Sequence, residues 1–394
     1  MKESLSIKLP PEGTLIRDFI LTSLSYLREK EPRINLEWLE DDVKVNASPL
    51  VLETAFRSLY GESAELAKNK VKKIRLGIIP NDKNAFSKLF GVKKDKVTGT
   101  YLDVMAKLLE KSSKNIKLST LSKLERHARG IRFGDGGIVA LGFLVAEKYE
   151  YGLEFGRLNF RLKFNIELDE AWYPLVLAGF VWCISTRLGE DTLFTFFPED
   201  FIKLEQMNTK IFNVIKRAFG GLSILQEKIN DTLCEVESIG EPFPATVLLL
   251  SLRLSKIAKD NGSLSIIGSE DFNSLPLSLC RLRRTPKTFV IIDKRRAEIS
   301  RVIKFSSSLA MKSDKSVNNL ERICRRTIQL ASGFRPRPDE PDFTVYNRFT
   351  TLLLQAIEQA YSIYEVVYYG SRYGLLSRTL GEDIIEIFST SPVL

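Results

Sequence analysis

The run RLNFRLKFNIELDEAWYPLVLAGFVWCIS, residues 157–185, decides the fold class. Its first part, residues 157–168, has an apolar side chain at every even-numbered position and a polar one at every odd-numbered position. This period of two is that of a β-strand with one buried face. Its last part, residues 174–185, is apolar and uncharged, but it is much shorter than the roughly 20 residues that cross a bilayer. The run therefore predicts a strand followed by a buried helix, and with them an α+β protein.

The segments before this run predict a mixed lobe. Residues 137–149 are the expected partner of the strand, with glycines in the turn region that connects them. We expect helices at residues 14–30, 49–60 and 101–111, and a short apolar strand at residues 72–80. Residues 84–90 lie between this strand and a lysine-rich turn. Ser48 as N-cap and Pro49 at the first helical position support the second helix, which Gly61 is expected to end.

The segments after the run predict mostly helices. Short strands are expected at residues 263–267 and 288–293, and helices at residues 317–330 and 343–367. We therefore expect an N-terminal mixed lobe with a small antiparallel sheet and a largely helical C-terminal half. Because single cores stop growing at roughly 250–300 residues, we expect two domains or lobes. Along the chain we distinguish three regions. These are a mixed lobe with a basic block (1–169), a helical region (170–262) and a basic strand-and-helix region (263–394).

Composition indicates a globular intracellular protein. Of the 394 residues, 44% are hydrophobic and 27% charged, which suits a large core. Residues 1–11 lack the apolar segment of a signal peptide, and the four cysteines are scattered as in proteins of a reducing compartment. We expect a soluble, cytoplasmic protein without a CxxC metal site and with buried free thiols at Cys183, Cys234, Cys280 and Cys324. Abundant charge and only five glutamines are typical of a thermophile.

The net charge of +9 is concentrated in two blocks. Residues 68–132 contain 18 basic and 5 acidic side chains, and residues 277–348 contain 17 and 7, so that the remainder is net acidic. Such segregation costs self-repulsion unless a polyanion offsets it, and neutralised phosphates release counterions. The blocks therefore predict nucleic-acid binding. The alternatives are solvated helical surfaces with acidic neighbours, or a scaffold that meets acidic protein partners.

The candidate contacts to nucleic acid are basic residues of these blocks, in three groups. The first block supplies Lys70, Lys72, Lys73, Lys83, Lys93, Lys94 and Lys96. The strand at residues 288–293 is flanked by Arg281, Arg283, Arg284, Lys287, Lys294, Arg295 and Arg296. The helix at residues 317–330 and the segment after it supply Arg322, Arg325, Arg326, Arg335 and Arg337.

The helix at residues 317–330 has two faces. The stripe expected to pack is formed by Leu320, Ile323, Thr327 and Leu330, and the opposite stripe by Arg322, Arg325, Arg326 and Gln329. Three guanidinium groups on one face could hold phosphates bidentately, whereas the alternative is an ordinary solvated face. Prolines after Arg335 and Arg337 exclude a helix and predict a stiff arm for reaching along a groove; a plain interdomain linker is the alternative.

A cluster of tyrosines lies near the end of the chain, together with Arg372 and Arg378: Tyr361, Tyr364, Tyr368, Tyr369 and Tyr373. Tyrosines at helical spacing usually belong to a core or an interface. Stacking on nucleic-acid bases is the sharper alternative.

Catalytic motifs are scarce. His127 is the single histidine, which excludes multi-histidine metal sites and relays, and the turn at residues 134–137 is not a phosphate-binding loop. Asp293 supports an alternative function, a metal-dependent DNA nuclease or recombinase, although three cationic residues follow it. We expect a protein that is not an enzyme and that needs no cofactor or metal.

In its overall layout, and above all in GIIPND at residues 77–82 and in residues 334–376, the chain resembles the large subunit of archaeal type I-A CRISPR interference complexes. The resemblance implies a non-catalytic subunit that contacts double-stranded target DNA near the protospacer-adjacent motif, and also the guide RNA. It further implies other CRISPR subunits and a recruited helicase–nuclease as partners, and no membrane. Base pairing would supply sequence specificity, and the protein would supply backbone grip and motif readout.

Overall fold

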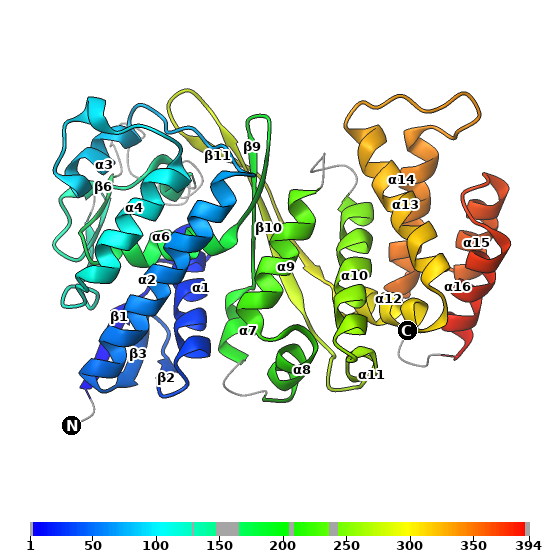
Figure 1. Ribbon diagram of the computed structural model, residues 1–394, viewed down its shortest axis with the longest axis horizontal. Coiled ribbons are helices and arrows are strands. Elements are labelled where there is room, and N and C mark those ends of the chain that lie inside the picture. Colours follow the sequence, from blue (N-terminus) through cyan, green and yellow to red (C-terminus); the bar gives the residue numbers. More distant parts are fainter. Residues whose placement is uncertain (1–2, 128–129, 147–164, 205–208, 236–242, 391–394) are drawn as a thin grey trace. The chain divides into compact units, whose positions relative to one another are not determined.

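The computed structural model describes residues 3–127, 130–146, 165–204, 209–235 and 243–390. The chain forms two compact units. Unit 1 comprises Met1–Lys203 and Ser278–Arg295, and unit 2 comprises Leu204–Leu277 and Arg296–Leu394. The boundaries of these units differ from those of the three expected regions. The reason is that a β-hairpin from the third region, residues 278–295, pairs with a sheet of unit 1 (Figure 1). The architecture is α+β, with small antiparallel pairings, a mixed N-terminal part and a helical C-terminal half.

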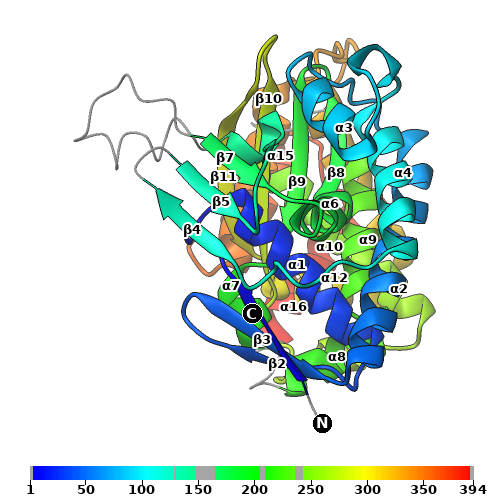
Figure 2. The ribbon, with the colours of Figure 1, turned by 90° about the vertical axis from the view of Figure 1, so that its left-hand side faces the viewer.

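Unit 1 contains three small sheets (Figure 2). The first, in the order β1-β3-β2, is antiparallel and consists of β1 (Glu3–Lys8), β3 (Asp42–Ala47) and β2 (Asn35–Trp38). The second has the order β4-β5-β7-β6 and contains β4 (Leu124–His127), β5 (Gly130–Phe133), β7 (Asn165–Leu168) and β6 (Ile138–Val139). The third has the order β11-β10-β9-β8 and contains β11 (Phe289–Glu298), β10 (Pro276–Arg284), β9 (Asp191–Phe196) and β8 (Ile184–Leu188).

The strand predicted at residues 157–168 is described only over its last four residues, which form β7; residues 147–164 lie outside the described part. As expected, β7 pairs antiparallel with the segment after Gly137, through Ile138↔Leu168 and Val139↔Glu167. On its other edge, β7 pairs parallel with β5, which makes this sheet mixed.

The apolar run forms the centre of unit 1. Helix α6 (Trp172–Cys183) is buried over its whole length and packs against α1 (Leu15–Lys30) and α2 (Pro49–Val71). The helix α4 (Tyr101–Lys114) lies along α2, α3 (Asp82–Phe90) precedes it, and α7 (Glu199–Leu204) follows β9. The 3-10 turns η1 (Lys94–Lys96) and η2 (Gly142–Val145) complete the described elements. Within the described residues, no helix is long and apolar enough to cross a membrane.

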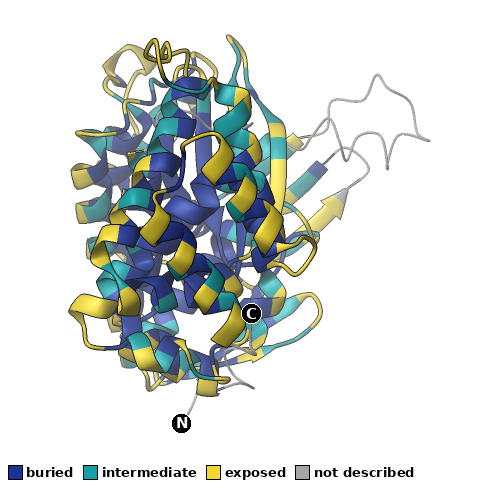
Figure 3. Ribbon diagram, turned by 90° about the vertical axis from the view of Figure 1, so that its right-hand side faces the viewer, coloured by how far each residue is buried: buried dark blue, intermediate teal, exposed yellow. Residues whose placement is uncertain are grey.

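Apart from the ends of β10 and β11 that fall within it, the regular structure of the described part of unit 2 is helical. It contains α8 (Thr209–Phe219), α9 (Leu222–Cys234), α10 (Phe243–Asp260), α11 (Leu264–Ile267), α12 (Ser300–Lys312), α13 (Asp314–Ala331), α14 (Phe343–Ile357), α15 (Ile363–Arg372) and α16 (Arg378–Thr390). Helix α10 contacts all the helices from α8 to α14 and is the central element. Figure 3 faces this unit and shows buried residues turned inward and exposed residues on the outer surface.

Several predicted elements are wrong. Residues 72–80 form no strand and carry a single bridge, Gly77↔Thr100, while residues 264–267 are helical. Helix α2 continues ten residues past Gly61, because a glycine in mid-helix weakens a helix without ending it. The helix predicted at residues 343–367 is two helices, separated at Gln359, whose φ is 63°. The strands β1–β3 and β8–β9 were not anticipated from the sequence.

Candidate nucleic-acid interface

In unit 1, residues from both basic blocks meet at the tip of the β10–β11 hairpin. The Asn81 side chain donates a hydrogen bond to the carbonyl of Lys287 at 3.3 Å, and Arg284 lies beside Gly77. Figures 1 and 2 both show the hairpin tip beside the loop that leads to α3. The turn η1 consists of Lys94, Asp95 and Lys96, follows Lys93 and packs against α3. We give the name tip surface to the cations of the hairpin tip, of α3 and of the segment around η1: Lys83, Lys93, Lys94, Lys96, Arg284 and Lys287.

The cations of the tip surface are available to an anion. Lys93, Lys94, Lys96 and Lys287 are exposed, and Lys83 and Arg284 are half-buried. Within the described part of the chain, none of the six forms a salt bridge. A concentration of cations without acidic partners is the arrangement that phosphate groups neutralise.

Lys70 is a wrong prediction. Its side chain is buried, and its ammonium group donates to the carbonyl oxygens of Val181 and Ile184 at 2.7 and 2.6 Å. These carbonyls lie where α6 ends, so Lys70 satisfies backbone groups that have no helical partner. It stabilises the α2–α6 packing and cannot reach a phosphate. Lys72 and Lys73, just beyond the end of α2, are exposed.

Most arginines and lysines along the β10–β11 hairpin itself are neutralised by acidic partners. Asp191 of β9 accepts from Arg283 at 2.7 Å and lies 3.8 Å from Arg281. Lys294 pairs with Asp18 at 3.2 Å, and Arg295 with Asp293 at 2.6 Å. Cross-strand and neighbouring carboxylates, which sequence spacing does not reveal, thus occupy the cations that we expected to bind nucleic acid. Arg296 is exposed and belongs to unit 2.

The first turn of α3, which holds Lys83, is fixed by a buried carboxylate. Asp82 accepts the Tyr101 hydroxyl at 2.5 Å and the amide of Gly142 at 2.9 Å. Burial raises the pKa of Asp82 to about 6, although these hydrogen bonds act in the opposite direction. This contact ties the start of α3 to α4 and η2, and so positions the end of the GIIPND segment.

The substitution Asp82→Asn is expected to change the pH dependence of unit 1. An acid whose pKa is raised on folding stabilises the fold below its unfolded pKa of 3.8, and this contribution is lost as the pH rises through about 6. Relative to the wild type, the Asn variant should therefore gain roughly 2–3 kcal/mol between pH 4 and pH 7. Denaturant unfolding of both proteins at each pH measures this difference. A constant difference across the range would contradict it.

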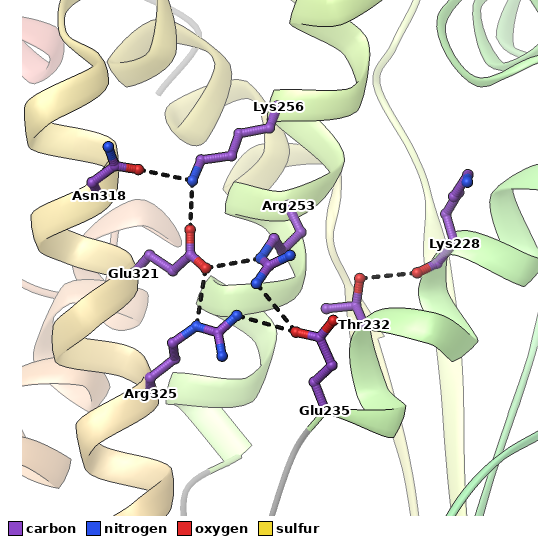
Figure 4. Close-up of polar contacts among 8 residues, drawn as sticks. All are labelled: Lys228, Thr232, Glu235, Arg253, Lys256, Asn318, Glu321 and Arg325. Carbon is purple, nitrogen blue, oxygen red and sulfur yellow. Dashed lines mark hydrogen bonds and ion pairs between the residues drawn. The ribbon is translucent and has the colours of Figure 1, made fainter. Parts of the chain in front are cut away.

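In unit 2, the apolar stripe of α13 is confirmed, but its basic stripe is wrong in part. Leu320, Ile323, Thr327 and Leu330 are all buried. On the other face, only Arg322 is exposed and forms no salt bridge within the described residues. Arg325 bonds Glu321 at 3.0 Å and Glu235 at 3.1 Å, and belongs to a network with Arg253 and Lys256 (Figure 4).

The arm after α13 is a helix–helix connection within unit 2, so the interpretation as an interdomain linker is wrong. Arg326 donates two hydrogen bonds to the Glu340 carboxylate, at 2.7 and 2.6 Å, and a third to the carbonyl oxygen of Arg335. The guanidinium of Arg326 holds the pKa of Glu340 at about 2. The arm is therefore folded back onto α13, with Arg335 and Arg337 exposed on it.

The tyrosine cluster is not in the core of unit 2. Tyr364 and Tyr368 are 65% and 68% exposed, and Tyr361 and Tyr373 are also exposed. Within the described part of the chain, every exposed Phe, Tyr or Trp lies between Phe334 and Tyr373. We call this surface the tyrosine face: Tyr361, Tyr364, Tyr368, Tyr369, Tyr373, Arg348 and Arg372.

The described residues contain no group of three or more His, Cys, Asp or Glu side chains that could hold a metal ion. Asp293 is engaged by Arg295. All four cysteines are free; three are buried as expected, and Cys234 is half-buried. The side chain of His127 lies outside the part of the chain that the structure describes.

Sequence reasoning missed two features of these surfaces. It did not pair Asp191 or Glu340 with the arginines that they neutralise, and no spacing signal could have done so. The exposure of the tyrosines could have been suspected from the charged residues between them, such as Glu365 and Arg372. Comparison of the chain with family models and with curated proteins gives no match.

Proposed function

We propose that this protein is a non-catalytic nucleic-acid-binding subunit of a CRISPR RNA-guided interference complex. In this role it contacts duplex target DNA near the protospacer-adjacent motif and the guide RNA, and helps to recruit a helicase–nuclease. The observation that carries the nucleic-acid part is the tip surface, where the segment at residues 77–81, which leads to Lys83 of one basic block, contacts Arg284 and Lys287 of the other. The CRISPR part rests on the resemblance of residues 77–82 and 334–376.

Contact between segments of the two basic blocks supports nucleic-acid binding more strongly than the net charge of the chain does. About 200 residues separate Lys83 from Lys287 in sequence, and the intervening chain is net acidic outside the blocks. A fold that minimised self-repulsion would place carboxylates between such cations, as it does for Arg283 and Lys294. The six cations of the tip surface form no such ion pair within the described part of the chain. A polyanion would offset this concentration of charge.

Replacing Lys83 and Lys287 together by alanine is expected to weaken binding of duplex DNA by about tenfold or more at 0.1 M salt. Each neutralised phosphate contributes about 0.9 to the slope of log affinity against log salt, so the slope should fall by about 2. Fluorescence anisotropy of a labelled duplex over a series of salt concentrations measures both quantities.

The matched control removes the same charge elsewhere. Lys216 and Arg217 are exposed on α8, outside both blocks, and their double alanine variant should keep the wild-type slope. If both variants lost the same affinity for DNA, the loss would follow from net charge alone. That result would contradict the role of the tip surface in binding. Cleavage of the duplex in Mg²⁺ or Mn²⁺ that is lost in Asp293→Ala would contradict a non-catalytic role.

The CRISPR assignment has its own test. The full chain, purified from its native cells, should carry an RNA that contains repeat-derived sequence at its 5′ end. Sequencing of the bound RNA gives the answer. A preparation that binds duplex DNA through Lys83 and Lys287 but carries only random cellular RNA would contradict the CRISPR assignment and leave the DNA-binding role.

A further inference from the structure

Helix α15 turns its tyrosines outward because its other face is fixed. Ile363, Val366 and Gly370 are the buried positions of this helix. A Cβ at Gly370 would lie 2.7 Å from Leu376 and 2.8 Å from Phe349, so only glycine permits this close approach. The opposite positions, Tyr364 and Tyr368, are one helical turn apart and share one face.

Arginines accompany the rings of this face. The guanidinium of Arg348, on α14, lies 5.7 Å from the ring centre of Tyr369, and that of Arg372 lies 5.8 Å from the ring centre of Tyr373. The two rings are themselves 4.8 Å apart at 48°. Cation–π contact holds the guanidinium groups beside the aromatic surface while leaving their N–H donors free to bond an anion.

Further cations lie on the elements next to this face. Helix α14 packs between α13 and α15, and the arm that leads into it displays Arg335 and Arg337. Arg322 is exposed on α13, which packs against α14. Exposed cations therefore occur on α13 and on the arm, in addition to the arginines of α14 and α15 that lie beside the rings.

We infer that the tyrosine face binds single-stranded nucleic acid, with unpaired bases stacked on Tyr364 and Tyr368 and phosphates held by the neighbouring arginines. This inference rests on the proposed function. It adds a second binding surface and specifies that this surface binds single-stranded nucleic acid. Base stacking on aromatic side chains combined with a cationic track is the usual way in which proteins hold single strands.

Two features favour a nucleic acid over a protein partner. Between Phe334 and Tyr373, every exposed large hydrophobic side chain is aromatic and none is aliphatic. Two carboxylates at the arm are engaged, since Glu340 is held by Arg326 and Asp342 caps α14 by accepting the amide of Val345, whereas Asp339 is exposed. Arg335, Arg337, Arg348 and Arg372 form no salt bridge within the described residues and can meet phosphates.

The test compares the full chain with its Tyr364→Ala/Tyr368→Ala variant on three labelled probes of equal length. These are a mixed-sequence single strand, an abasic single strand with the same phosphates, and a duplex. We expect the variant to bind the base-bearing strand about tenfold or more weakly, since one base stack is worth about 1–3 kcal/mol. Its affinity for the abasic strand and the duplex should be unchanged. Tyr364→Phe/Tyr368→Phe keeps the rings and should bind all three probes as the wild type does.

The other possible results of this binding experiment also support or overturn the inference. An equal loss on the abasic strand, or no loss at all, overturns base stacking and assigns the face to a protein partner. Wild-type protein that binds the duplex but no single strand overturns this inference and leaves the proposed function. Tyrosine-dependent binding of the single strand without any binding of the duplex supports the inference and contradicts the role of the tip surface.

Discussion

Replacement of Gly179 by alanine is expected to destabilise unit 1 by about 3 kcal/mol or more, the upper range for overpacking a core. Gly179 lies in α6 where that helix crosses α1, and a Cβ at this position would lie 1.9 Å from the carbonyl oxygen of Phe19. Because the clash is with backbone, no side-chain rotation relieves it, and the two helices must separate. The edge-to-face contact of Phe19 with Phe180, at 5.7 Å, would be disturbed as well.

Tryptophan fluorescence measures this effect in unit 1 alone, because all three tryptophans, at positions 38, 172 and 182, belong to it. The matched control is Gly61→Ala in α2, where nothing lies within 4 Å of the new Cβ. That variant should gain about 0.5–1 kcal/mol from helix propensity. A Gly179→Ala protein that unfolds at the wild-type denaturant concentration would show that α1 and α6 are not packed as described.

Glu321→Ala is expected to destabilise unit 2 by about 2–3 kcal/mol. The Glu321 side chain is 11% exposed and accepts from Arg253 at 2.8 Å, Lys256 at 2.6 Å and Arg325 at 3.0 Å (Figure 4). Its removal leaves three cations together between α10 and α13 with Glu235 as the remaining carboxylate of the network. The cations are about one-third exposed, so solvent screening reduces the cost below that of a fully buried pair.

The expected loss is measured as a lower midpoint for thermal loss of helical circular dichroism. Glu235→Ala is the control within the same network, since Glu235 is 52% exposed and should contribute less than about 1 kcal/mol. If both variants lost the same stability, burial of Glu321 would not be what makes the network important.

Local sequence signals predicted the elements that carry strong periodic patterns. Helices α1, α6 and α13 appear where the apolar spacing places them, and Thr14 caps α1 by accepting the amide of Arg17. The short strands β1, β8 and β9 were missed, because five or six residues give too little pattern to separate a strand from a helix segment. Their pairing is decided by partners distant in the chain.

The candidate contacts divide in the same way. Sequence identified the positions of the basic residues, but it did not distinguish Lys287, which is exposed, from Lys70, which is buried against backbone carbonyls. It predicted three available arginines on α13, of which Arg325 and Arg326 are held by carboxylates. Whether a basic side chain can bind a phosphate depends on the groups that lie next to it in the fold. Many of these groups belong to other helices and strands.

By itself, then, the sequence determined the α+β class, the buried helix and the two blocks of positive charge, because each follows from composition or from periodicity along the chain. The helix was predicted at residues 174–185 and is α6, Trp172–Cys183, since Ile184 already begins β8. Only the tertiary structure decided that the β10–β11 hairpin joins unit 1 and brings Lys287 beside Asn81. It alone decided that Tyr364 and Tyr368 face outward. The physical reason is that burial and ion pairing are properties of packed neighbours, and the spacing of residues along one segment does not specify which distant segment will pack against it.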